Sequence, residues 1–244
     1  MSGATLLWRQ YRFERRLFWR NPSAAFFNFS LPTIFLLLIA SVFHTDKQEL
    51  RVLVPGIAGM AVMATTFTAL AFNLTFNREQ GILKRMRGTP LPAGHYFGGL
   101  IGSAITNAVI QVLLVVALGH LLYGVHWPHD WLALAVFTLL GVTAFASLGI
   151  AFSQLIPNFD AAPAYVNAVF LPAIFISGVF YDTKHLPSVL KGVAEALPLK
   201  HVIDGLGGAI VTGSGIAHHW GAVGALLAWG AGGVYLAIRK FRWE

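Results

Sequence analysis

Charged side chains are scarce in this chain, and cysteine is missing altogether. Asp, Glu, Lys and Arg make up 11% of its 244 residues, whereas about 25% is usual for a soluble domain. A water-soluble surface needs polar residues along every element, and this chain has too few of them. The lack of cysteine excludes disulfides, thiolate metal sites and thiol nucleophiles. The composition therefore predicts an integral membrane protein.

The sequence also lacks the parts of a transporter that powers itself. It contains no G-x-x-x-x-G-K-[ST] phosphate loop. Ion-driven carriers generally keep ionisable side chains at membrane depth, and the apolar stretches of this chain hold no Asp, Glu, Lys or Arg. If the protein does work, we expect a separate chain to supply the energy.

Six stretches are free of Asp, Glu, Lys and Arg, and each is long enough for a helix to cross a hydrocarbon core of roughly 30 Å. Lipid offers the backbone no hydrogen-bond partners, so helices are the expected structure. We predict an all-α integral membrane protein with a six-helix transmembrane domain over 24–238. Its spans are predicted at 24–43, 52–76, 96–123, 131–155, 161–181 and 220–238.

The distribution of Lys and Arg predicts the orientation. The N-terminal tail, the loops at 77–95 and 156–160 and the C-terminal tail together carry twelve, and the loops on the other side carry five. The positive-inside rule then places both termini in the cytoplasm, with a short tail at 239–244, in a multi-pass protein of the cell (inner) membrane. The same rule explains the basic excess without nucleic acid, which we do not expect as a partner.

Residues 1–23 are predicted to form an amphipathic helix at the cytoplasmic surface. Arg9, Arg12, Arg16 and Arg20 recur on one helical face, and Leu7, Tyr11 and Phe18 fall on the opposite face. Such a helix suits an anionic membrane surface, so membrane lipid is an expected partner. A contact with a cytoplasmic protein along one edge stays open.

The segment NREQGILKRMRGTPLP, residues 77–92, is predicted to be a short helix with defined ends. Asn77 can cap it, Ile82 and Met86 share one face, and Gly88 and Pro90 end it. An ordinary positive-inside loop would explain the basic residues alone. The cap, the apolar seam and the stop favour a rigid helix that docks into a groove on another protein.

Two alternatives of another class stay open at this point, an ATPase-independent channel and a metal-dependent membrane enzyme. His126, His129 and Asp130 in HWPHD have ligand types and a spacing that a metal site can use. The segment is a short loop with no third recurring ligand type nearby. We therefore expect no metal, no catalytic residue and no enzymatic activity in this chain.

Two motifs resemble those of ABC type-2 exporter permeases, the membrane-spanning subunits of ABC transporters, and the match looks nearest to drug, antibiotic and Nod-factor exporters. REQGILKRMRGTPLP at 78–92 is similar to the family segment E-R-E-x-G-T-L-x-x-L-x-x-T-P-L. FISGVFYDTKHLPSVLKGVAEALPLKHVIDGL at 175–206 is similar to F-x-S-G-x-F-x-P-x-x-x-L-P followed by P-L-x-x-x-x-D-x-L. Asp182 stands where the family usually has Pro, and Gly207 where Arg often follows.

The resemblance implies a partner and a coupling site. Such permeases pair two membrane chains, as a homodimer or related heterodimer, with two cytoplasmic ABC ATPase subunits, which would bind the ATP and Mg²⁺; no cofactor is expected on this chain. Residues 1–23 would be the connecting helix and 182–206 a re-entrant outer pair of helices. The 77–92 helix would be the coupling helix, with contacts at Arg78, Glu79, Gly81, Leu83, Lys84, Arg85, Thr89 and Pro90.

The resemblance also implies a substrate path between the second and fifth spans of a dimer. Its candidate residues are Thr65, Phe67, Thr68, Asn73, Asn167, Phe170, Phe175 and Ser177. For any one of them, hydrogen bonding between helices is an equally good explanation, and Gly98 with Gly102, and Gly221 with Gly224 and Ala228, are expected to allow close helix packing. The expected cargo is a drug-like or lipid-like amphipathic molecule; a polysaccharide or lipid-linked glycan is the alternative.

Overall fold

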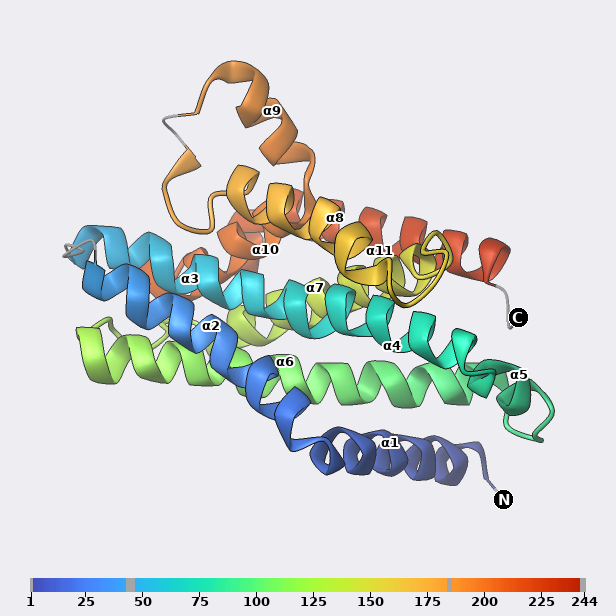
Figure 1. The fold of residues 1–244 in the computed structure, drawn as a ribbon. Coiled ribbons are helices and arrows are strands. Elements are labelled where there is room, and N and C mark those ends of the chain that lie inside the picture. Colours follow the sequence, from blue (N-terminus) through green and yellow to red (C-terminus); the bar gives the residue numbers. More distant parts are fainter. Residues whose placement is uncertain (1, 43–46, 184–185, 242–244) are drawn as a thin grey trace.

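The fold is all helical over the residues that the computed structural model describes, 2–42, 47–183 and 186–241 (Figure 1). The α-helices are α1 Gly3–Arg20, α2 Pro22–Val42, α3 Lys47–Met63, α4 Ala69–Glu79, α5 Ile82–Arg87, α6 Ala93–Tyr123, α7 Trp131–Phe152, α8 Ala162–Ile176, α9 Ser188–Ala196, α10 Pro198–Gly207 and α11 Trp220–Lys240. Two π-helices, η1 Ala64–Thr68 and η3 Gly208–Thr212, and a 3₁₀-helix, η4 Ile216–His219, complete the order.

Each predicted span contains a helix. Four continuous helical stretches in the described part of the chain are long and apolar enough to cross a membrane. These stretches are Glu49–Glu79, Ala93–Tyr123, Trp131–Phe152 and Ile216–Arg239. In addition, α1 and α2 form a pair bent by 72°. The chain is therefore a membrane protein with four or five candidate spans, and the exact six-span layout stays a prediction.

The fifth predicted span ends earlier than the sequence indicated. Helix α8 has 15 residues and stops at Ile176, which gives about 22 Å at 1.5 Å per residue. Gly178 follows with a φ of 75°, a backbone conformation that α-helices do not contain. The apolar run continues to Tyr181, but its last residues form a turn beside α3.

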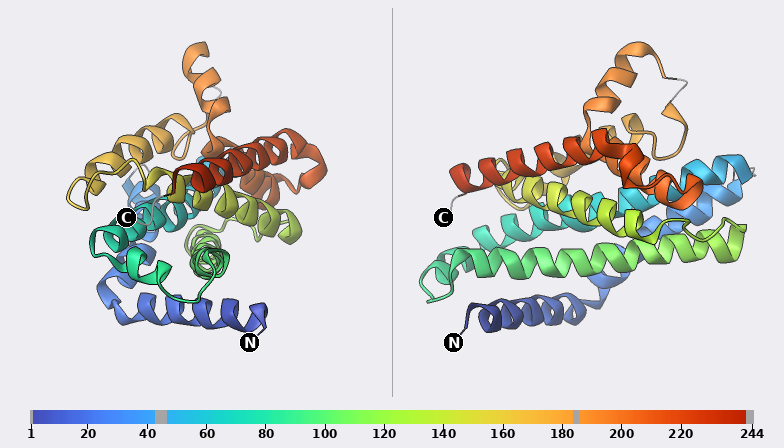
Figure 2. Two further views of the ribbon diagram at one scale, coloured as in Figure 1. Left: turned by 90° about the vertical axis from the view of Figure 1, so that its right-hand side faces the viewer. Right: turned by 180° about the vertical axis from the view of Figure 1, so that it is seen from behind.

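The core lies where α3, α6, α7 and α10 meet. Helix α10 is short, yet Leu199, Val202 and Leu206 are completely buried in it, and Gly205 allows the Phe137 ring of α7 to approach. Helix α9 instead stands away from the bundle (Figure 2). The predicted pair of short helices at 182–206 is thus present, with one member inside the core and one outside it.

The connecting segment 1–23 contains the predicted helix, but its buried face is polar. Gln10 and Glu14 are the buried residues of α1, while the four arginines of the predicted stripe are exposed. Helix α1 packs on α6, where Tyr11 Oη and Thr106 Oγ1 share a hydrogen bond of 3.0 Å and Arg15 donates to Asn107 Oδ1. A side chain at Gly99 would meet Gln10 at 2.4 Å, so small residues on α6 make this contact possible.

The glycines that were predicted to allow close packing between spans do not have the predicted packing partners. Gly98 and Gly102 do permit close packing, but the partner is α1 and not another span. Nothing lies within 4 Å of a Cβ added at Gly221 or Gly224, whereas one at Gly233 would meet Ser147 Oγ at 2.3 Å. Helix α11 packs on α7, with Gly233 at the closest approach to Ser147.

Glu14 provides a prediction on pH. Burial raises the pKa of Glu14 from 4.5 to about 7, and a hydrogen bond from Gln10 Nε2 opposes part of that rise. Between these two pH values the folded chain holds a proton that the unfolded chain has lost, so stability falls as the pH rises from 4.5 to 7. Glu14→Gln should remove this loss and stabilise the protein above pH 7 by on the order of 1–3 kcal/mol.

The measurement is the unfolding temperature in detergent, followed for parent and Glu14→Gln from below pH 4.5 to above pH 7. The two curves should meet at the acid end and separate as the pH rises. Glu195→Gln, a change of an exposed carboxylate on α9, is the matched control and should leave the shape of the curve unchanged. Parallel curves for parent and Glu14→Gln would contradict the prediction.

Candidate functional site

The segment predicted to dock on a partner is an elbow between α4 and α5, and its start differs from the prediction. Helix α4 runs on to Glu79, with Gln80 N bonded to Phe76 O at 2.9 Å, so Asn77 is inside a helix and does not cap one. Asn77 Nδ2 instead donates to Asn73 Oδ1 at 2.7 Å. Gly81, with a φ of 65°, makes the break. The intrahelical bonds of the span simply continue past the last apolar residue, which leaves no free N–H for Asn77 to cap.

Helix α5 is anchored by one residue. Leu83 is fully buried in a small cluster that includes Leu74, Tyr96 and Leu100. Ile82 and Met86, the predicted seam, are half-buried beside it. Among the other predicted contact residues of the elbow, Gly81 is half-buried at the break. The rest are exposed: Lys84, Arg85, Thr89 and Pro90. The result is a short helix fixed on its inner face with basic side chains on its outer face.

The end of α5 is closed as expected. Thr89 Oγ1 donates to Met86 O at 2.7 Å, and Arg85 Nη2 donates to Gln80 O at 3.0 Å. Pro90 then prevents the helix from continuing. The start of α1, the end of α11 and α5 lie at the same end of the bundle (Figure 1).

Arg78 and Glu79 bind a second loop of this chain. Arg78 donates from Nη1 to Ser153 O at 3.0 Å and from Nη2 to Ile156 O, and Glu79 Oε2 accepts from Phe159 N. These groups were proposed as contacts to a partner, and the structure shows them joining the elbow to the 153–161 loop between α7 and α8. These hydrogen bonds therefore tie the α4–α5 elbow to the loop that follows α7.

Arg78→Gln should loosen the 153–161 loop. The change removes two hydrogen bonds from a charged donor, worth about 1.5–3 kcal/mol each when lost. We expect amide exchange in the loop to accelerate by roughly tenfold or more. Hydrogen–deuterium exchange of the detergent-solubilised chain measures this, and Lys84→Gln, at an exposed position on α5, is the control. Equal exchange in both variants would show that the Arg78 hydrogen bonds do not hold the 153–161 loop.

The predicted substrate-path residues lie in different environments in the part of the chain that the structure describes. Thr65 is buried and donates to Ala61 O at 2.8 Å, which is the structural role that its residue type also permitted. Phe67 lines an apolar cavity and Ser177 lines a polar one. Thr68 and Phe170 are half-buried, and the remaining three are exposed: Asn73, Asn167 and Phe175.

A π-helix in the second span is a feature that we did not predict. Thr66 Oγ1 donates to Val62 O at 2.5 Å, and Thr65 makes the equivalent bond one residue earlier. Threonine bonds of this kind widen or bend helices, so the ATTFT sequence is the signal that was missed. Gly149 of α7 fits against the widened turn, since a Cβ there would lie 2.7 Å from Phe67 O. π-Bulges are frequent at functional sites.

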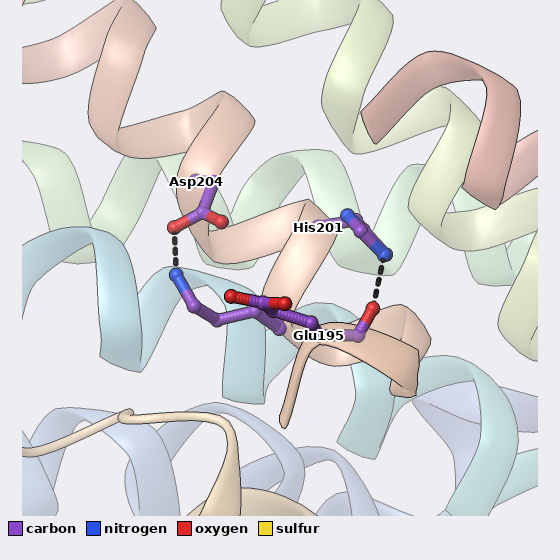
Figure 3. Close-up of polar contacts among 4 residues, drawn as sticks. Glu195, His201 and Asp204 are labelled. Atoms are coloured by element: carbon purple, nitrogen blue, oxygen red, sulfur yellow. Dashed lines mark hydrogen bonds and ion pairs between the residues drawn. The ribbon is translucent and has the colours of Figure 1, made fainter. Parts of the chain in front are cut away.

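The second motif surrounds a polar cavity of about 400 Å³ at the opposite end of the bundle. Its charged lining residues are Arg51, Asp182, Lys191, Glu195, Lys200 and Asp204. Lys200 Nζ pairs with Asp204 Oδ1. His201 Nε2 is bonded to Glu195 O at 2.9 Å (Figure 3). The Asp of the D-x-L run is therefore held by a lysine one turn earlier on α10, a partner that we did not predict.

The HWPHD loop is not arranged as a metal site. The rings of His126 and His129 are 6.2 Å apart, and Asp130 Oδ1 accepts from Ala133 N at 2.9 Å as the N-cap of α7. Among the described residues, no group of three His, Cys, Asp or Glu is placed to hold a metal.

A sequence model of the family "ABC-2 type transporter" matches residues 4–211, from α1 to η3. The chain belongs to this family. The match includes both the α4–α5 elbow and the α9–α10 pair, so the resemblance that the two motifs indicated is confirmed.

Individual relatives agree with the family. "Nodulation protein J" of Rhizobium leguminosarum bv. viciae is 33% identical over 61% of this chain and 57% of its own length. "Nodulation protein J" of Rhizobium meliloti strain 1021 is 27% identical over 76% and 70%. The "Probable multidrug ABC transporter permease YbhR" of Escherichia coli K12 is 24% identical over 69% and 46%. The matched region thus covers 57%, 70% and 46% of the lengths of these three proteins.

Proposed function

We propose that this protein is the membrane-spanning subunit of an ATP-driven ABC exporter, with α5 as the coupling helix that sits in a groove of a separate ATPase. The observation that carries the proposal is the construction of α5. Its inner face is fixed by the buried Leu83, and its outer face presents Lys84 and Arg85 to solvent. A two-sided helix of this kind suits docking better than an ordinary loop does.

The hydrogen bonds from Arg78 and Glu79 to the 153–161 loop support a route by which movement of the ATPase reaches the spans. When ATP draws two ATPase subunits together, α5 is pushed along with them. The Arg78 bonds to Ser153 and Ile156 carry that push to the end of α7, and the continuous α4 carries it into η1. The cavity between two permease chains then changes from facing the cytoplasm to facing outward. ATP and Mg²⁺ belong to the ATPase, and this chain contributes no catalytic group.

The proposed cargo is an amphipathic drug-like or lipid-like molecule. Relatives named for nodulation and for multidrug transport support this class. Two copies of the chain, or this chain and a related one, would form the path, because the exposed Asn73, Asn167 and Phe175 are open to a second permease.

Charge reversal on α5 tests the coupling site. Lys84→Glu with Arg85→Glu should abolish co-purification of the co-expressed ATPase while the chain still inserts into the membrane. Lys191→Glu, which makes the same change on the exposed α9 at the far end of the bundle, is the control. Undiminished recovery of the ATPase with the double variant would refute α5 as the coupling helix.

Transport in inverted membrane vesicles tests direction and cargo. An exporter accumulates a fluorescent amphipathic dye inside such vesicles only with ATP and the ATPase present. Accumulation of a lipid-linked glycan but not of the dye would favour the glycan alternative. ATP-independent flux through the purified chain alone would indicate a channel and overturn the proposal.

A further inference from the structure

An apolar cavity of about 260 Å³, here called the intramembrane pocket, lies among η1, α7, α8 and α11. Its remaining wall is the bend between α9 and α10, which we call the α9–α10 elbow. Met63 and Phe67 form one wall, and Leu197, Pro198 and Leu199 of the elbow form another. The pocket takes its walls from this chain. It also lies apart from the polar cavity around Lys200 and Asp204.

The pocket offers nothing to a polar ligand. Each lining side chain is aliphatic, aromatic or a thioether. Trp229 is the one lining residue with a side-chain N–H, and its Nε1 donates to Ala196 O at 3.0 Å. Cavities lined in this way stay dry and bind apolar molecules. The chemical class of the ligand is therefore a hydrocarbon chain.

The mouth of the pocket faces the apolar flank of the bundle. Leu155 is 58% exposed, Leu236 40% and Val169 39%, and the three come from the turn after α7, from α11 and from α8. Helices α7 and α11 are both candidate spans, so hydrocarbon is what surrounds this flank. A molecule that reaches the pocket from the side arrives through the bilayer.

We propose that the intramembrane pocket holds one acyl chain of a membrane phospholipid. The chain enters past Leu155 and Leu236 and packs against Phe67 at the π-helix and Leu199 at the start of α10. It thus lies between the widened turn of the second span and the α9–α10 elbow. Trp229 forms part of the wall and also donates a hydrogen bond to Ala196 O in the α9–α10 elbow. An acyl chain in the pocket therefore packs against a residue that holds this elbow. This site goes beyond the proposed transport function and does not depend on it.

Photolabelling of the full chain in lipid nanodiscs tests the proposal. The probe is a phosphatidylglycerol with a diazirine near the end of one acyl chain, and mass spectrometry locates the adducts. We expect adducts on pocket residues of η1, α7 and α10 above the level on the exposed Leu227, a lipid-facing reference on α11. Labelling of the pocket no stronger than that of Leu227 would overturn the proposal.

Two matched variants sharpen the test. Ala173→Phe fills the pocket from α8, where Ala173 is nearly buried. Labelling in the pocket should fall by about tenfold, the factor expected when roughly two methylenes are excluded from an apolar site. Leu139→Phe adds a ring on an exposed part of α7 outside the pocket and should leave labelling unchanged. Equal labelling of parent and Ala173→Phe would refute the site.

A second readout covers the case in which Ala173→Phe does not fold. Phospholipids brominated along the chain should quench parent fluorescence more than that of Trp229→Phe, because Trp229 would contact the chain directly. Two other outcomes would also overturn the proposal. One is labelling that occurs in nanodiscs with one copy of the protein and is lost in nanodiscs with two. That result would show that a second copy covers the mouth of the pocket. The other is labelling by a diazirine-bearing amphipathic dye that excess phospholipid does not compete away, which assigns the pocket to cargo.

Discussion

Leu83→Asp is expected to detach α5 and abolish assembly with the ATPase while the spans stay folded. The side chain is fully buried among Leu74, Tyr96 and Leu100, and an unpaired carboxylate in such a place costs several kcal/mol. Helix α5 has six residues and cannot persist without its packing, because helices this short are unstable alone. If about 3 kcal/mol is lost, the affinity for the partner falls by roughly two orders of magnitude.

The absence of cysteine makes the detachment directly measurable. A single cysteine at Met86, which is half-buried, should react with a water-soluble maleimide much faster when Leu83→Asp is present. Co-purified ATPase should disappear in the same preparation. Leu83→Met, which nearly conserves volume and costs less than about 1.5 kcal/mol, is the control for both assays. Slow labelling together with lost ATPase would show that Leu83 acts on the partner directly and not by anchoring α5.

The spans were predictable because one strong constraint determines them. Within lipid the backbone must satisfy its own hydrogen bonds, so a stretch such as 96–123 without Asp, Glu, Lys or Arg had to be helical, and α6 covers it completely. The ends of elements were less predictable. Asn77 had the residue type of a cap, but the helix before it had no reason to stop until Gly81, and the sequence alone does not rank these two signals.

The contacts that organise the candidate site were beyond the sequence. Arg78 was expected to contact a partner because the resemblance of the 78–92 motif implied it, yet it binds carbonyls that are 75 and 78 residues away. No prediction was made for Gln10 and Glu14, and they are the buried residues of α1. In each case a partner distant in sequence decides the environment, and no local pattern encodes it. The motif at 78–92 nevertheless predicted the position of the elbow.

Gly56→Ala is expected to destabilise the whole fold. A Cβ at this position on α3 would lie 1.9 Å from Val179 O and 2.7 Å from Val179 C. Both atoms are backbone, so no rotamer change can relieve the clash, and the turn after α8 must move away from α3. Val179 is fully buried, which means that the movement also opens the core. An overpacking cost of about 3 kcal/mol or more lowers the unfolding temperature by roughly 6–12 °C in a chain of this size.

Thermal unfolding of the purified chain in detergent, with the yield of monodisperse protein, measures the effect of Gly56→Ala. Gly232→Ala is the matched control, because this glycine is inside α11 with nothing within 4 Å of an added Cβ. Alanine is the better helix former by about 1 kcal/mol, so the control should be neutral or slightly stabilised. An unchanged unfolding temperature for Gly56→Ala would mean that the turn at Val179 is not seated on α3. In that case the early end of α8, which depends on this turn, would also need another cause.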